Sequence, residues 1–166
     1  MPKPIYLICS ESGAVDENTK FSSLFNLVEK VQFSTAQPSP GQILMARPVS
    51  LRMQAYWARE ETDAPETRFE VQFVGIFPNG PQEIPLAGGE FQFTSPFQRL
   101  NVVGFQIAQC FGPGILWLEA RIRRVGEEAW INRMEYPIVL EDITPSEPAA
   151  AQQPEQTTPQ PPAQAG

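Results

Sequence analysis

The sequence contains no histidine. This absence excludes the catalytic arrangements in which a histidine activates a serine or cysteine nucleophile. It also removes the most common protein ligand of transition metals. We therefore expect no metal centre and no cofactor, and a histidine-based pH switch is impossible.

Basic residues are scarce and scattered. Twelve Lys and Arg stand against 19 Asp and Glu, which gives a formal net charge of −7, and no basic run is longer than Arg123-Arg124. Proteins whose main partner is DNA or RNA usually carry a basic face that neutralises phosphates. We expect neither nucleic acid nor a membrane among the partners of this chain.

Long apolar runs are also missing. The N-terminal segment has one four-residue run, residues 5–8, whereas a secretory signal needs about 7–15 apolar residues and a membrane-spanning helix about 20. The two cysteines, Cys9 and Cys110, are too few for a zinc site of their own. We expect both to be reduced, buried thiols rather than a disulfide. These features predict a cytoplasmic location.

The last part of the chain, residues 143–166, differs in composition from the rest. It holds six of the 18 prolines and, after Ile143, no aromatic residue and no Val, Leu, Ile or Met. Such a segment cannot bury enough apolar surface to offset its ordering entropy. We expect one folded domain, residues 1–142, followed by a disordered Pro/Gln/Ala-rich tail, residues 143–166.

Alternating apolar and polar residues predict β-structure in the folded part. The clearest run has five apolar side chains at every second position, Val49, Leu51, Met53, Ala55 and Trp57. Similar runs follow at residues 69–77, 100–110 and 116–122. Because side chains alternate across a strand, each run predicts a strand with one buried face. Turn signals between the runs give about eight or nine strands.

Other segments are less regular. Residues 11–19 have the composition of a turn. Residues 21–33 fit either a helical stripe or two short strands with a bend at residues 28–30, and their aromatic content favours the strands. Gly88-Gly89 predicts a turn between two short strands. The prolines at positions 81 and 85 indicate a sheet edge there.

Many short strands without alternating helices are typical of an all-β domain. We predict an antiparallel β-sandwich, immunoglobulin-like in the broad sense. A small closed β-barrel is the alternative.

Short segments at both ends of the domain support this fold class by resemblance. These segments are Leu7-Ile8-Cys9, a loop with Asp16, residues 20–29 (KFSSLFNLVE), and a closing hairpin from Gly114 to Ile138. They resemble an uncharacterised bacterial family of small immunoglobulin-like β-sandwich proteins. The resemblance implies strands at residues 21–33 and implies nothing about mechanism.

Acidic residues are the only candidates for chemistry. The loop with Glu60, Glu61, Asp63 and Glu66 could bind calcium at one end of a sandwich, but a solvated connection is the simpler interpretation. Paired carboxylates can hydrolyse glycosides without histidine, and the strand residues available for this are Glu70, Glu119 and Glu135. We expect these to be ordinary acids on the wet faces of strands. The catalytic and metal-binding residue sets are therefore predicted to be empty.

The most promising contact residues lie on the strand at residues 115–124. Trp117, Arg121 and Arg123 share the face opposite Leu116, Leu118 and Ile122. If the apolar set is buried, the first set faces solvent, and Trp and Arg are enriched at binding hot spots. The sequence therefore predicts a protein contact at Trp117, Arg121 and Arg123, with either a partner protein or a second copy of the chain. The alternative is a surface Trp that simply rests on the two Arg stems.

Three functions remain open, and we favour the first. It is a non-catalytic protein-interaction or structural module. The second is a small-molecule or carbohydrate-binding module, with stacking candidates Tyr56, Trp57, Trp117 and Trp130. The third is an enzyme that uses carboxylates or a bound metal. A flat aromatic surface would favour the first, an aromatic groove the second, and a deep carboxylate pocket the third.

Overall fold

The fold is all-β in the computed structural model, which describes residues 1–15, 22–34, 49–80, 83–107 and 112–144. Nine strands are found in these ranges: β1 (Lys3–Val15), β2 (Ser22–Leu27), β3 (Lys30–Phe33), β4 (Val49–Ala58), β5 (Arg68–Ile76), β6 (Ile84–Gln92), β7 (Phe97–Ile107), β8 (Gly114–Arg124) and β9 (Asn132–Asp142). The predicted all-β class and strand number are confirmed. Within the described ranges no helix is long and apolar enough to cross a membrane.

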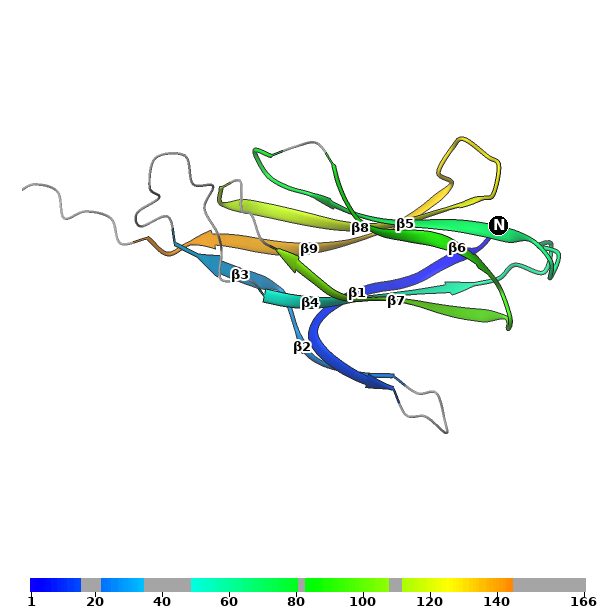
Figure 1. The fold of residues 1–166 in the computed structure, drawn as a ribbon, viewed down its shortest axis with the longest axis horizontal. Coiled ribbons are helices and arrows are strands. Elements are labelled where there is room, and N and C mark those ends of the chain that lie inside the picture. Colours follow the sequence, from blue (N-terminus) through cyan, green and yellow to red (C-terminus); the bar gives the residue numbers. More distant parts are fainter. Residues whose placement is uncertain (16–21, 35–48, 81–82, 108–111, 145–166) are drawn as a thin grey trace, which may run out of the picture.

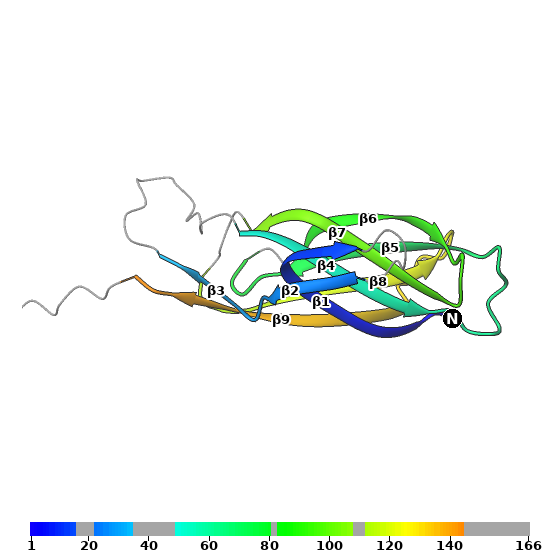
Figure 2. The same ribbon diagram turned by 90° about the horizontal axis from the view of Figure 1, so that it is seen from below.

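The strands form two stacked sheets (Figures 1 and 2). One has four strands in the order β2-β1-β4-β7, and the other has five in the order β3-β9-β8-β5-β6. Every neighbouring pair is antiparallel except β3 and β9, which run parallel. The predicted β-sandwich is confirmed, with this one parallel pair as an addition.

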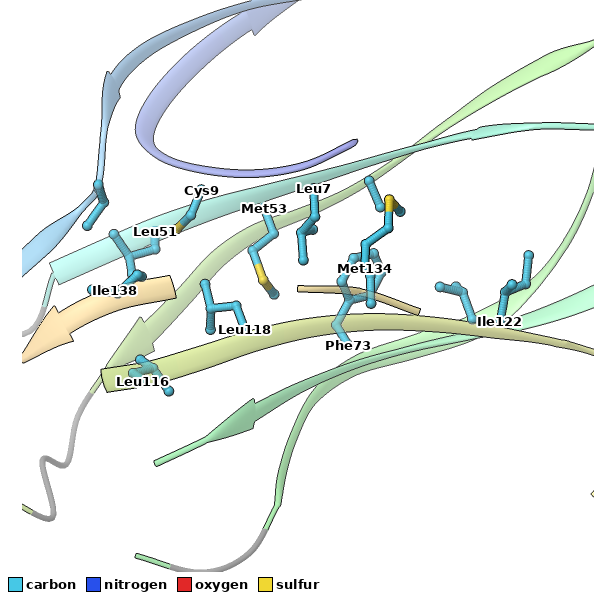
Figure 3. Packing of buried hydrophobic residues seen from close by; sticks show 14 of the residues in the cluster. Leu7, Cys9, Leu51, Met53, Phe73, Leu116, Leu118, Ile122, Met134 and Ile138 are labelled. Atoms are coloured by element: carbon cyan, nitrogen blue, oxygen red, sulfur yellow. The ribbon is translucent and has the colours of Figure 1, made fainter. Parts of the chain in front are cut away.

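The core lies between the two sheets and is built from their inward-facing side chains (Figure 3). In β4 every second residue from Leu51 to Trp57 is buried, as the alternation predicted. In β8 the buried set on the core side is Leu116, Leu118, Ala120 and Ile122. This assignment fixes the opposite side of β8 as an outer face of the molecule.

Residues 22–33 form two strands that belong to different sheets. β2 pairs with β1, and β3 pairs with β9. Near the end of β2, Asn26 adopts a left-handed conformation with φ of 56°, which Asn tolerates better than most residues. The Val28 N–H then donates to the Cys9 carbonyl, and the Val28 side chain enters the core. The expectation of two strands with a bend is confirmed.

Two predicted turns are wrong. Gly88-Gly89 lies inside β6, where these residues pair with Gln72 and Val71 of β5. A Cβ on Gly88 would lie 3.1 Å from the Val71 carbonyl oxygen, so the missing side chain serves a close backbone approach rather than a turn. Residues 11–15 continue β1 and pair with β2, because ladder hydrogen bonds override a weak local preference. The position of β6 at a sheet edge is as the prolines predicted.

The acidic loop after β4 is not simply solvated. Asp63 is buried and accepts hydrogen bonds or ion pairs from the Met1 ammonium group and from Arg124, both at 3.0 Å. Glu60 pairs with the same ammonium group and with Lys3. Burial works to raise the pKa of Asp63, but the hydrogen bonds from Met1 and Arg124 outweigh it and hold that pKa below its usual value. Internal cations thus occupy two of the four carboxylates that were calcium candidates, Glu60 and Asp63.

Candidate functional site

The candidate site lies on the outer face of the five-stranded sheet. Its central row is the outward side of β8, which carries Ile115, Trp117, Glu119, Arg121 and Arg123. Trp117 is 38% exposed, and alternation along β8 predicted this side for it. The Trp117 ring is therefore held on a rigid strand in the middle of a sheet rather than on a loop.

Apolar side chains from three strands surround Trp117. Pro137 of β9 lies directly opposite it, and Ile76 of β5 is its partner on the other side. One step along the strands, Ile115 pairs with Val139, and these two side chains are 46% and 45% exposed. We call these residues the apolar patch: Ile76, Ile115, Trp117, Pro137 and Val139. Sequence analysis found only Trp117, because the other members are brought to it by strand register.

The two arginines of the predicted set are engaged inside the molecule. Arg121 donates to both carboxylate oxygens of Glu83, at 3.1 Å and 2.6 Å, and to Gln72 at 3.0 Å. The ion pair holds the pKa of Glu83 below its usual value. Arg123 donates to Glu70 at 2.8 Å and to the Glu128 carbonyl oxygen at 3.1 Å.

Both arginines also stack on an aromatic ring, but that ring belongs to Trp130. The guanidinium carbons of Arg121 and Arg123 lie 5.3 Å and 4.3 Å from the Trp130 ring centre. Trp130 comes from the turn between β8 and β9, which rises from the outer side of the five-stranded sheet (Figure 1). The predicted three-residue set thus divides. Trp117 lies in the apolar patch, and the arginines hold the turn that carries Trp130.

Glu119 lies between these two parts of the face. It is 3% exposed although it lies on the outward side of β8, where Val74 and Glu135 flank it across the sheet. Burial raises the pKa of its carboxyl group, while Arg121 and Arg133 act in the opposite direction. The expectation that Glu119 is an ordinary acid on the wet face of a strand is wrong, because its side chain is removed from solvent.

The aromatic stacking candidates are not brought together. Trp57 is fully buried in the core. Tyr56 lies on the other sheet, between the rings of Tyr6 and Phe97 and under Arg99. Trp130 is covered by two guanidinium groups. Only Trp117 of the four presents a ring that no described side chain stacks on.

Two hollows in the described surface were considered as ligand sites. One, of about 300 Å³, lies over β5 and β6 and includes a single carboxylate, Glu70, which Arg123 already binds. The other, of about 290 Å³, lies between β3 and the β1–β2 hairpin and includes Glu11, which accepts a hydrogen bond from Asn26. Within the described ranges no group of three acidic or cysteine side chains could hold a metal ion.

No known protein family, curated protein or solved structure matches this chain. The resemblance to a bacterial family of immunoglobulin-like proteins therefore stays a prediction.

Proposed function

We propose that this protein is a non-catalytic interaction module that binds another protein through the apolar patch centred on Trp117. The observation that carries the proposal is a Trp ring, 38% exposed, among four apolar side chains on the outer face of a sheet. Large aromatic side chains in the centre of a patch supply much of the energy of protein interfaces. Association would remove this apolar surface from water.

The charged surroundings of the patch support a protein contact. Four cations on this face are paired with carboxylates: Lys30 with Glu141, Arg121 with Glu83, Arg123 with Glu70, and Arg133 with Glu135. An apolar centre within a polar rim is the usual anatomy of an interface. These pairs offset most of the charge on this face, although the chain carries a net charge of −7, and Glu119 is the carboxylate that they leave unpaired.

The other functions have less support from the geometry. A carbohydrate-binding groove needs several accessible rings, and the candidates lie on different sheets, in the core or under arginines. Glycoside hydrolysis needs two carboxylates around a substrate cleft, and each described hollow includes one, already engaged. The positions of these rings and carboxylates favour the interaction module over the other two functions.

The test is affinity capture from the cells that produce the protein, with three tagged chains compared. These are the original protein, a Trp117→Ala variant and a Phe97→Ala variant. Phe97 is a matched control because it is 51% exposed on the other sheet. We expect a stoichiometric protein that the original chain and Phe97→Ala retain and Trp117→Ala loses. Equal retention by all three, or capture of no protein, would contradict the proposal.

A second copy of the chain is the alternative partner, and the same variants identify that case. Sedimentation velocity would then show a dimer for the original protein and for Phe97→Ala, and a monomer for Trp117→Ala. The contact surface stays the same in both cases, while the identity of the bound protein differs.

We also propose a cytoplasmic location. Cys9 is a free, buried thiol, which suits a reducing compartment. Fractionation of the producing cells tests this, and recovery of the protein outside the cytoplasmic fraction would contradict it.

A further inference from the structure

The carboxylate of Glu119 has no hydrogen-bond or ion-pair partner among the described residues, although the residue is only 3% exposed. Its two nearest cations are committed elsewhere. Arg121 is held by Glu83 and Gln72, and Arg133 extends toward Glu135 at 3.6 Å. Both arginines lower the pKa of Glu119 only through electrostatic attraction at longer range, without a hydrogen bond. A buried carboxylate without a partner is costly, so its retention calls for a physical reason.

The Glu119 oxygens are not fully enclosed. The fully enclosed side-chain polar atoms without partners include Ser10 Oγ, Trp57 Nε1 and Asp63 Oδ2, and the Glu119 oxygens are not among them. Glu119 also points away from the core, since Leu118 and Ala120 on either side of it face inward. The small part of Glu119 that is exposed, 3% of the residue, therefore faces solvent on the outer side of β8.

Trp117 lies next to this carboxylate on the same side of β8. Residues two apart on a strand share a face and are separated by about 6.6 Å along the strand. Glu135 lies directly opposite Glu119 on β9, which adds a second negative charge beside the first. An exposed Trp ring and two carboxylates together form a surface that attracts a cation with an apolar stem.

We propose that the face around Trp117 is a socket for a basic side chain of the partner protein, whose cation stacks on Trp117 and pairs with Glu119. This inference rests on the proposed interaction function and specifies the chemistry of the partner. Arginine fits best, because its planar guanidinium group both stacks on an aromatic ring and binds a carboxylate through two hydrogen bonds. The chain's net charge of −7 would also attract a basic partner surface.

The charged groups around the socket support the same choice of ligand. Three acidic residues and two basic residues surround it: Glu83, Glu119, Glu135, Arg121 and Arg133. On β5 the partner of Glu119 is Val74, so no titratable group of that strand lies directly beside it. These five groups carry three negative charges against two positive ones, which favours an incoming cation over an anion. An incoming cation would replace the missing partner of Glu119 and offset the cost of its burial.

The experiment uses n-butylguanidinium as the probe and n-butylurea as its neutral control. The full chain is titrated with each compound at pH 7 while the Trp117 indole signal is followed by NMR. We expect a saturable shift with n-butylguanidinium, with a dissociation constant on the order of 10 mM for so small a ligand, and no saturable shift with n-butylurea. Glu119→Gln should weaken the binding at least about tenfold, and the exposed control Glu66→Gln should not change it.

A second measurement in the unaltered protein does not depend on any variant. The pKa of Glu119, followed by carboxyl NMR, should fall when n-butylguanidinium is added, because the bound cation favours the charged form. Equal responses to the two compounds, an unchanged response in Glu119→Gln, or an unchanged pKa of Glu119 would overturn the socket. If only the socket is wrong, the original protein still captures a partner and Trp117→Ala still loses it. If the original protein binds n-butylguanidinium but captures no partner through Trp117, the proposed function alone is overturned.

Discussion

Arg123 and Trp130 lie with the guanidinium carbon 4.3 Å from the centre of the indole ring. This contact joins the end of β8 to the turn that follows it, and Arg121 adds a second cation to the same ring at 5.3 Å. The two arginines therefore hold Trp130 of the turn over one part of the outer face. The neighbouring part contains Trp117, which is 38% exposed, and is the contact surface that we propose.

The division of β8 into a core side and an outer side predicts effects of different size for two truncations. Leu118→Ala should lower the free energy of unfolding by about 2–5 kcal/mol, because it leaves a cavity in the packed core. Ile115→Ala on the outer side should lower it by less than about 1 kcal/mol. Urea denaturation measures both. A larger loss of unfolding free energy for Ile115→Ala than for Leu118→Ala would contradict the assignment of Leu118 to the core side and Ile115 to the outer side.

The ion pair of Arg121 and Glu83 should contribute little to stability in spite of its two hydrogen bonds. Glu83 is 44% exposed in its side chain, and solvent-exposed pairs usually contribute about 0.2–1 kcal/mol. A double-mutant cycle with Arg121→Ala and Glu83→Ala gives the interaction energy directly. A coupling of several kcal/mol would show that the pair is much less hydrated than the structure indicates.

Glu119→Gln should stabilise the protein at pH 7. Burial raises the pKa of Glu119 in the folded state, so the folded protein holds the proton more tightly than the unfolded chain. The penalty for the charged form is present above the folded pKa and disappears as the pH falls below the unfolded value. The stability difference between Glu119→Gln and the original protein should therefore be large at pH 7 and small near pH 3, as measured by denaturation at each pH. A difference that grows on acidification would contradict this account.

Cys9 should be inert in the folded protein. Its side chain is fully buried, and burial raises its pKa to about 12, so very little reactive thiolate is present at neutral pH. Alkylation without reductant, followed by peptide mass analysis, should leave Cys9 unmodified in native buffer and modify it fully in denaturant. Rapid native labelling of Cys9 would contradict its place in the core. Cys110 lies outside the described residues, and its predicted reduced state is tested by the same experiment in denaturant.

Local alternation was sufficient to predict much of the fold. It gave the buried side of β4 and β8 and the exposed side of Trp117, because side-chain direction along a strand follows directly from sequence position. For residues 21–33 alternation left a helix and two strands open, and the aromatic content favoured the strands. It could not show that β3 joins β9 in the other sheet, since pairing partners are not encoded in the local pattern.

The site was predicted only in part, for a similar reason. Sequence analysis placed Trp117, Arg121 and Arg123 on one side of β8, but could not show that Glu83 and Glu70 hold the arginines. The burial of Glu119 could not be predicted either, because its neighbours Val74 and Glu135 are brought beside it by strand register from distant positions. Gly88-Gly89 was wrongly expected to turn, because glycine in a strand serves close backbone approach as readily as it serves turns.

The most direct test of the central claim is the affinity of the captured partner for the original protein and for Trp117→Ala, measured by calorimetry. The account predicts a loss of binding free energy of about 2 kcal/mol or more, or roughly 30-fold in the dissociation constant, because central aromatic residues dominate interfaces. The melting temperature of Trp117→Ala should stay close to that of the original protein. An unchanged dissociation constant, or unfolding of the variant, would contradict the claim that Trp117 forms the contact surface.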